Sequence, residues 1–314
     1  MQSALNALEL SRADHIQRLK GAAYMTSPWT IGIIGGSGLY ALEGLEDEQW
    51  ISVKSPFGDP SDEILCGRIG DVRLRFLPRH GRGHPIPPSE VNARANIDAL
   101  KRAGCTDLIA ISAVGSLREE IEPGRFAVVE QFIDRTTARE NSFFGPGFVA
   151  HVSMSDPVCA RLSKKLTEAI ATAKGKIATG ATYLAMEGPQ FSTRAESRMY
   201  RQWGADVIGM TAMPEARLAR EAELPYALVG MVTDYDCWRE GEAVDVGQVV
   251  AQMQLNSKLA RDMVANFIKK LPKKRTKSPI DTALDDAVIT APDQHEPKLM
   301  AKLDAVAGRL LKSE

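Results

Sequence analysis

Cysteine is scarce in this sequence, and the few cysteines stand far apart. The 314 residues include four of them, Cys66, Cys105, Cys159 and Cys237. No two form a Cys-x-x-Cys pair, so neither a disulfide framework nor a zinc knuckle is indicated. We expect reduced thiols and a cytoplasmic protein.

A charge excess and a long apolar run are also missing. The 39 basic and 40 acidic residues give a net charge of −1, which does not favour nucleic acid or a membrane surface as a partner. No apolar stretch approaches the roughly 20 residues that span a bilayer. The mixed charges of residues 1–20 exclude the apolar core of a secretory signal.

What the chain does contain is a regular alternation of β-type runs and helical patterns. Strands are predicted at Ile31–Ile34, Val72–Leu77, Leu108–Ala113, Phe126–Phe132, Ala181–Met186, Val207–Met210 and Tyr226–Thr233. Helices are predicted at Ser89–Ala103, Val158–Ala173, Arg194–Trp203, Pro214–Glu223 and Asp245–Leu271. This pattern predicts an α/β fold, in which a central mixed or parallel sheet is flanked by helices on both faces.

The boundaries of three segments follow from the same patterns. Residues 1–28 form an N-terminal extension, 29–271 a single domain, and 272–314 a basic, proline-bounded linker with a short helical tail. We interpret the linker as a solvated hinge. In the last long helix we expect Val246, Val249, Met253, Met263 and Phe267 to face inward.

A glycine-rich loop ends the first predicted strand. In Gly32-Ile-Ile-Gly-Gly-Ser-Gly38, backbone N–H groups can approach an anion closely, and Ser37 adds a hydroxyl. Gly36-x-Gly38-x-x-Ala41 also fits the dinucleotide fingerprint, so a nicotinamide-dependent oxidoreductase is one hypothesis. A tight turn that binds nothing explains the segment equally well.

The run Arg79-His-Gly-Arg-Gly-His84 is dense in donors. Guanidinium groups suit a multi-oxygen anion such as phosphate, and His80 can donate as well. The spacing of His80 and His84 also suggests a metal. However, the intervening glycines disfavour a helix and no carboxylate cluster completes a coordination shell, so no metal is expected.

Hydroxyl and aromatic side chains stand near the ends of further predicted strands. Ser112 and Thr211 could complete an anion pocket, because ligands of open α/β sheets bind at the carboxyl ends of strands. Strand-end packing and a plain helix N-cap are the alternatives. Phe191 and Ser192 could stack on and hydrogen-bond a base, or could simply lead into a helix.

Two acids follow the almost wholly apolar strand Tyr226–Thr233. Asp234 and Asp236 point to the same side in extended geometry, so one of them can be kept protonated. A protonated and an ionised carboxyl together match the acceptor N7 and the donor 6-amino group of an adenine edge. A solvated pair of acids is the alternative.

Taken in order, seven motifs resemble those of 5′-methylthioadenosine phosphorylases, a family in the trimeric purine nucleoside phosphorylase group. They are Ile-Gly-Gly-Ser-Gly-Leu, Arg-His-Gly-Arg-Gly-His, Ser-Leu-Arg-Glu-Glu-Ile, Gln-Phe-Ile-Asp-Arg-Thr, Glu-Gly-Pro-Gln-Phe-Ser, Gly-Met-Thr-Ala-Met-Pro-Glu and Thr-Asp-Tyr-Asp-Cys-Trp. Each motif is moderately specific, but seven in order from about Ile31 to Leu271 make coincidence implausible. The resemblance implies a homotrimer with sites at subunit interfaces, and it leaves a hexamer open.

The resemblance also implies a role for each matching residue. Phosphate would contact Ser37, Arg79, His80, Ser112, Ala113 through its backbone, and Thr211. The ribose would lie against Met210, and the base would meet Phe191, Ser192, Asp234 and Asp236. The 5′-alkylthio pocket would be lined by Val246, Val249, His84, Pro88 and, from a neighbouring subunit, His151.

Specificity within the group depends on Asp234, because phosphorylases for 6-oxopurines carry asparagine there. The resemblance therefore implies phosphorolysis of 5′-methylthioadenosine in purine and methionine salvage, with phosphate as co-substrate and no cofactor. A phosphorylase that prefers adenosine, inosine or 5′-methylthioinosine and a catalytically silent purine-binding protein are the other hypotheses.

Overall fold

The computed structural model describes residues 29–39, 41–239 and 244–311 of the chain. The N-terminal extension predicted for residues 1–28 and the last three residues of the predicted tail lie outside the described residues. The strands are β1 (Thr30–Gly35), β2 (Glu46–Ile51), β3 (Ile64–Ile69), β4 (Val72–Pro78), β5 (Asp107–Ser116), β6 (Phe126–Asp134), β7 (Ile177–Ala185), β8 (Val207–Gly209) and β9 (Tyr226–Asp234).

The helices alternate with these strands. The α-helices are α2 (Ala93–Arg102), α3 (Ala160–Thr172), α4 (Arg194–Gln202), α5 (Ala212–Glu221), α6 (Val246–Lys269), α7 (Pro297–Lys302) and α8 (Gly308–Leu311). Four short 3-10 helices are η1 (Ser37–Leu39), η2 (Pro88–Glu90), η3 (Pro279–Thr282) and η4 (Pro292–Gln294). Among the described residues, no helix combines the length and the apolar character that crossing a bilayer requires.

The strands form one mixed sheet in the order β2-β3-β4-β1-β5-β8-β7-β6-β9. Strand β9 pairs with β5 as well as with β6, so the five strands from β5 to β9 close into a ring. Strands β4, β1, β5 and β9 are parallel neighbours. Their carboxyl ends therefore meet at one edge of the sheet, here called the carboxyl edge, and their first residues meet at the opposite, amino edge.

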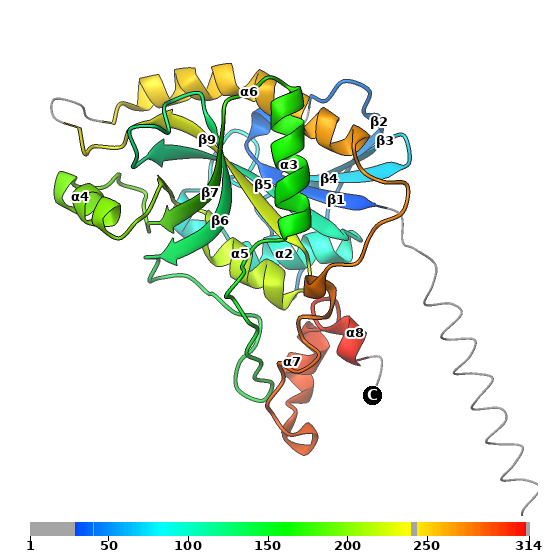
Figure 1. The fold of residues 1–314 in the computed structure, drawn as a ribbon. Helices are drawn as coiled ribbons and strands as arrows, with labels where there is room; N and C mark the ends of the chain where they lie inside the picture. The colour runs from blue at the N-terminus through cyan, green and yellow to red at the C-terminus, as the bar shows by residue number, and fades with distance from the viewer. Residues whose placement is uncertain (1–28, 40, 240–243, 312–314) are drawn as a thin grey trace, which may run out of the picture.

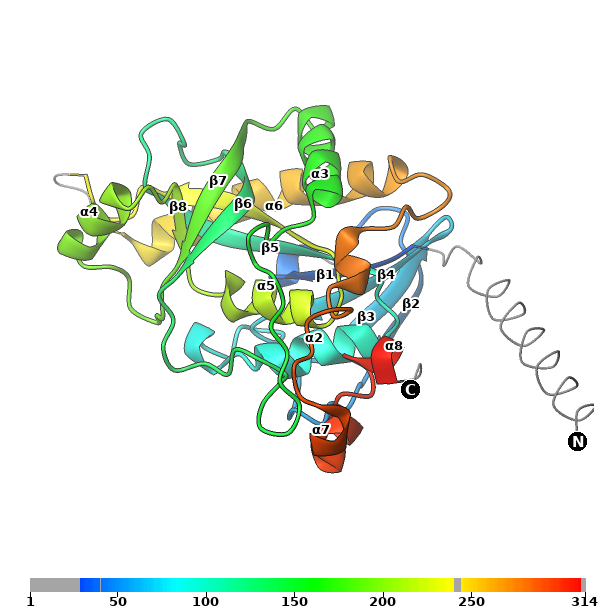
Figure 2. The ribbon, with the colours of Figure 1, turned by 60° about the horizontal axis from the view of Figure 1, so that its bottom comes forward.

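Helices cover both faces of the sheet, as the sequence predicts. Figures 1 and 2 show α3 and α6 on one face and α2 and α5 on the other. Each face has its own buried core, one containing Leu166 and Phe267 and the other containing Leu100 and Leu218. The single α/β layer arrangement is thus confirmed, whereas closure of the ring was not predicted.

Strands β2 and β3 were not predicted from the sequence. The sequence of β2 does not look like that of a strand. β2 reads Glu-Asp-Glu-Gln-Trp-Ile, and its first four residues are exposed. It lies at the open end of the sheet, where it pairs only with β3. Charged residues on such an edge strand discourage pairing with other chains.

Several predicted boundaries were wrong by a few residues. Helix α2 begins at Ala93 and is capped by the Asn92 side chain, which accepts from the Ala95 amide at 3.0 Å, so Ser89 is not its cap. Helix α5 is bounded by Ala212 and Glu221, but Met213 is extended (φ −116°, ψ 135°), so its regular helical turns open at Pro214, as predicted. In α6, Met263 and Phe267 are buried as expected, but Val246 is 62% exposed because the first turns of this helix extend past the core.

The segment after α6 is not a solvated hinge. The Arg275 side chain is only 12% exposed and forms ion pairs with Asp107 at 2.5 Å and Asp281 at 2.6 Å. Further along the tail, Leu284, Leu303 and Val306 are buried in the same core as α2 and α5. The basic run thus begins a docked segment, since Arg275 bonds a carboxylate 168 positions away in the sequence.

Candidate active site

Arg79 directly follows β4 and lies fully within the protein. Its Nε and Nη2 donate to the two oxygens of Glu215 at 2.9 and 3.1 Å, and two further N–H groups donate to the carbonyls of Ile111 and Ile34. Burial opposes the charged form, but the Glu215 carboxylate outweighs it and raises the pKa of Arg79. Because a guanidinium has five N–H donors, one Nη1 donor is left over for a ligand.

Glu215 is a residue that sequence reasoning quoted in a motif but gave no role. It also accepts a hydrogen bond from the Tyr226 hydroxyl at 2.8 Å. Burial, followed by the adjacent Glu215 charge, raises the pKa of Tyr226 well above its usual value. The Arg79–Glu215 ion pair is therefore shielded from water and held in place by hydrogen bonds. This fixes the guanidinium beneath the carboxyl edge.

His80 is half-buried and held by a backbone contact. Its Nδ1 lies 2.9 Å from the Ile86 carbonyl, which can only accept, so Nδ1 carries the proton of the neutral ring. Burial lowers the pKa of His80 to about 4. The ring of His84 stacks on it at 4.1 Å between centroids. In the neutral state Nε2 is an acceptor, so His80 donates to an anion only after gaining a second proton.

Hydroxyl groups converge where β5, β7 and β8 meet. Thr211 occupies the N-cap position of α5, but its side chain makes no capping hydrogen bond, so the plain N-cap interpretation is wrong. Ser112 and Thr211 are both nearly buried. Burial raises the pKa of the Tyr183 hydroxyl. The nearby Thr211 and Ala212 amides and the Ser112 hydroxyl act in the opposite direction and lower this pKa. None of these groups is aligned for a hydrogen bond with the Tyr183 hydroxyl.

The loop after β1 contributes backbone to the same edge. The Arg79 amide donates to the Gly35 carbonyl at 3.0 Å, which places the two loops side by side. Ser37 begins the short helix η1, and its side chain is outside the described atoms. Among the described residues between Ser37 and Ile51, this three-residue helix and β2 are the elements that follow the glycines, so the long helix that a dinucleotide fingerprint requires is not found there.

Asp236 is buried and Asp234 is half-buried at the end of β9. Asp234 accepts from the Thr233 hydroxyl and the Asp236 amide, each at 2.7 Å. Burial raises the pKa of both carboxyls, and Asp234 raises that of Asp236 further. A Cβ at Gly115 would lie 3.0 Å from Asp234 Oδ1, so this glycine gives the carboxyl its space. Burial thus shifts the ionisation of both carboxyls toward the protonated form.

The loop carrying Phe191 and Ser192 lies against this acid pair. The Cys237 thiol donates to the Ser192 carbonyl at 3.1 Å. The hydroxyls of Ser192 and of buried Ser197 on α4 favour the ionised form of Asp236, against the effect of burial on its pKa. The loop of Phe191 and Ser192, here called the base loop after its expected role, thus meets the segment of the acid pair, where Cys237 is 45 positions from Ser192.

Other expected site residues lie at the surface of the single chain. Phe191 is 45% exposed, and Val246 is 62% exposed. Ala113, Met210, Pro88 and Val249 are half-buried, and His84 and His151 are exposed. The His151 amide donates to the Ala287 carbonyl of the tail at 2.8 Å. These apolar and aromatic groups leave surface available for a ligand or a second subunit.

Arg139 and Glu187 form a second, half-buried ion pair, which sequence reasoning missed. They lie 2.9 Å apart in the loops that follow β6 and β7. The Arg139 guanidinium also donates to four backbone carbonyls, those of Met186, Glu187, Met210 and Met213. No pattern signalled this pair, because 47 residues separate its members.

Metal ligands are not gathered anywhere in the described part of the chain. No group of three or more histidine, cysteine, aspartate or glutamate side chains there is arranged to hold an ion. The carboxyl edge instead brings together Arg79 with its partner Glu215, His80, and the carboxyls of Asp234 and Asp236.

Comparison with known proteins assigns the chain to a family. Residues 30–269 fit the model of the phosphorylase superfamily. The chain is 57% identical over 286 residues to the S-methyl-5′-thioadenosine phosphorylase of Cereibacter sphaeroides, covering 90% of this chain and 98% of the relative. The chain belongs to the S-methyl-5′-thioadenosine phosphorylase family. A second member, from Rhodospirillum rubrum, is 54% identical and covers 90% of this chain and 97% of its own.

Solved structures of this family share the fold. A methylthioadenosine phosphorylase from an antarctic soil metagenomic library superposes with a TM-score of 0.85 at 42% identity, over 89% of this chain and 99% of its own. The Schistosoma mansoni methylthioadenosine phosphorylase in complex with adenine gives 0.70 at 39% identity, over 77% and 91%. The superfamily match includes every strand and helices α2 to α6, so it contains the whole carboxyl edge.

Proposed function

We propose that this enzyme cleaves 5′-methylthioadenosine with inorganic phosphate, giving adenine and 5-methylthioribose-1-phosphate. The observation that carries the proposal is the adjacent pair of half-buried Asp234 and buried Asp236, joined by the Asp236 amide at 2.7 Å, in which burial raises the pKa of both carboxyls. A carboxyl that keeps its proton can serve N7 of an adenine, and its ionised neighbour can accept from the 6-amino group. In the family motif, an aspartate at position 234 accompanies 6-aminopurine substrates.

Phosphate would be held at the other side of the edge. The leftover Arg79 donor, the Thr211 and Ser112 hydroxyls, Ser37, His80 and the Ala113 amide supply its contacts. The Arg79–Glu215 pair is already oriented by three further hydrogen bonds, so the guanidinium loses little freedom when the anion binds. A phosphate fixed beneath C1′ removes much of the entropic barrier, up to ~7–11 kcal/mol for ideal positioning.

The reaction passes through a transition state with oxocarbenium character at the ribose. The negative phosphate stabilises that cation and attacks C1′ as the glycosidic bond breaks. Asp234 delivers or shares a proton at N7, so adenine leaves as a neutral base. Met210 lies against the ribose, Phe191 and Ser192 meet the base, and no metal or organic cofactor takes part.

The 5′-alkylthio group would occupy an apolar pocket formed by Val246, Val249, His84 and Pro88, completed by His151 of a neighbouring subunit. The exposure of Val246 and of His151 on the single chain supports a homotrimer, in which a second subunit covers them. The four cysteines, all free thiols, fit a cytoplasmic location.

The decisive experiment is chromatographic detection of adenine after the enzyme is mixed with 5′-methylthioadenosine, with and without phosphate. Adenine that appears only with phosphate, together with 5-methylthioribose-1-phosphate, supports the proposal. Adenine without phosphate would indicate a hydrolase. Faster turnover of adenosine, inosine or 5′-methylthioinosine would overturn the substrate assignment, and no turnover of any of them would indicate a silent purine-binding protein.

A further inference from the structure

The Arg139 guanidinium has a complete set of acceptors. Nε donates to Glu187 Oε1 at 2.9 Å, and Nη1 donates to the carbonyls of Met210 and Met213 at 2.5 and 2.8 Å. Nη2 donates to the carbonyls of Glu187 and Met186 at 2.5 and 3.5 Å. Five donors thus meet five acceptors, and the side chain is only 6% exposed.

These acceptors come from two loops that carry different parts of the candidate site. Met186 and Glu187 follow β7 and lead to the base loop, where the Ser192 hydroxyl lies 3.5 Å from the Met186 sulfur. Met210 and Met213 flank Thr211, which follows β8. A Cβ at Gly188 would lie 2.6 Å from the Met210 sulfur, so the two loops are also in tight contact.

Glu187 closes the arrangement from the other side. Its Oε2 accepts from the amides of Thr137 and Ala138 at 2.5 and 3.2 Å, in the same loop as Arg139. Although burial opposes ionisation, these amides and the guanidinium keep the pKa of Glu187 below its usual value. Arg139, in the loop after β6, is therefore hydrogen-bonded to both of the other two loops.

We propose that Arg139 is a positioning residue that sets the distance between the base loop and the phosphate loop, and so aligns the nucleoside with phosphate. This inference rests on the proposed function. Arg139 itself touches neither substrate; it holds the carbonyl that precedes Thr211 at a fixed place relative to Met186. Because in-line attack depends on this placement, a shift of about 1 Å can lower the rate about 10²-fold.

The role predicts a specific kinetic signature. Lysine has its three N–H donors on one nitrogen and cannot reproduce the planar guanidinium group that reaches both loops. Arg139→Lys should therefore misplace the loops and lower kcat about 10- to 100-fold. Each loop keeps its own contacts, so the Kd of phosphate alone and the Kd of adenine alone, measured by calorimetry, should remain close to wild type. In Arg139→Ala, millimolar guanidinium should restore part of kcat.

Arg275→Lys is the matched control. Arg275 is also nearly buried, and it also donates to two carboxylates and a carbonyl, but at the amino edge. The Arg275→Lys variant should have a lower melting temperature than the wild type, but the same kcat and the same Kd for phosphate and for adenine. Wild-type turnover is measured in the same series, so an inactive wild type would refute the proposed function rather than this inference.

Two results would overturn the positioning role. One is an Arg139→Lys variant with wild-type kcat. The other is a loss of kcat matched by an equal loss of affinity for phosphate alone and adenine alone, without guanidinium rescue of the alanine variant, since a generally loosened structure would behave in that way. A selective fall in kcat with rescue would establish it.

Discussion

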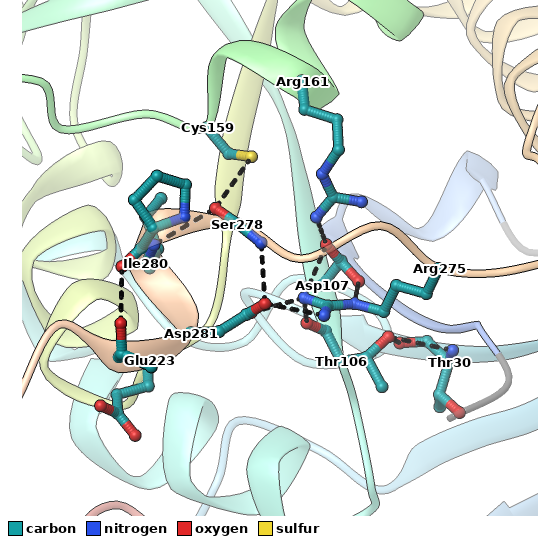
Figure 3. Close-up of polar contacts among 12 residues, drawn as sticks. Thr30, Thr106, Asp107, Cys159, Arg161, Glu223, Arg275, Ser278, Ile280 and Asp281 are labelled. Atoms are coloured by element: carbon teal, nitrogen blue, oxygen red, sulfur yellow. Dashed lines mark hydrogen bonds and ion pairs between the residues drawn. The ribbon is translucent and has the colours of Figure 1, made fainter. Parts of the chain in front are cut away.

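Two pairs of aspartates, each with one buried and one half-buried member, lie at opposite edges of the same sheet and have opposite surroundings. At the amino edge, Asp107 and Asp281 are bonded by the guanidinium groups of Arg161 and Arg275, as Figure 3 shows. At the carboxyl edge, Asp234 and Asp236 have hydroxyl, thiol and amide neighbours, and no cation contributes to the pKa of either carboxyl.

The pKa values follow from this difference. Burial acts on Asp281, but the Arg275 hydrogen bond outweighs it and lowers the pKa of that carboxyl. At Asp234 and Asp236 the hydroxyl and amide groups offset burial only in part, so the pKa values of both carboxyls are raised. Two acids balanced by two cations make a structural clamp for the tail, whereas two uncompensated acids can exchange a proton with a ligand.

The most severe test of the comparison is Asp234→Asn. The amide keeps the size and the contact with the Asp236 amide, but it cannot deliver a proton to N7. We expect turnover of 5′-methylthioadenosine to fall ~10²–10⁴-fold, with the melting temperature nearly unchanged. Steady-state assays with 5′-methylthioadenosine and inosine check this. Wild-type turnover of 5′-methylthioadenosine by the variant would remove Asp234 from the acid role.

Asp107→Asn is the corresponding change at the amino edge. It leaves Arg161 and Arg275 partly buried beside a neutral side chain, so the free energy of unfolding should fall by about 3–5 kcal/mol. Because this edge binds no substrate, kcat per folded molecule should not change. Chemical denaturation and active-site titration separate the two effects. Lost turnover in fully folded protein would show that the two edges are coupled.

A smaller effect concerns His80 and pH. The pKa of His80 is lowered to about 4, so its imidazole ring is neutral at pH 7 in the free enzyme. To accept a hydrogen bond from this ring, bound phosphate must either bring a proton or raise the pKa of His80. The phosphate complex therefore holds one proton more than the free enzyme does. Because protons become scarcer as the pH rises, the Kd of phosphate should increase with pH, by up to about tenfold per pH unit. Calorimetry between pH 6 and pH 8 measures it.

His80→Gln supplies the control for this pH effect. Glutamine keeps a donor but does not titrate, so the Kd of its complex should follow only the ionisation of phosphate itself. Identical pH profiles for the variant and the wild type would show that His80 takes no part in proton uptake.

Much of the carboxyl edge could be predicted because its residues follow strands directly. Arg79 comes after β4 and Asp234 ends β9, so the α/β pattern alone places both at one edge. The partners of these groups could not be predicted in the same way. Glu215 lies 136 positions from Arg79, and its role appears only when α5 packs beneath the sheet.

The amino-acid sequence by itself determined the order of seven of the nine described strands and of helices α2 to α6, the glycine positions and the family, because these depend on local pattern and motif. The tertiary structure decided which charges are balanced and which are left open. Closure of the ring through β5 and β9 brings Asp234 opposite Gly115, and tail docking brings Arg275 to Asp107. Such pairings depend on packing between distant segments, which no local pattern encodes.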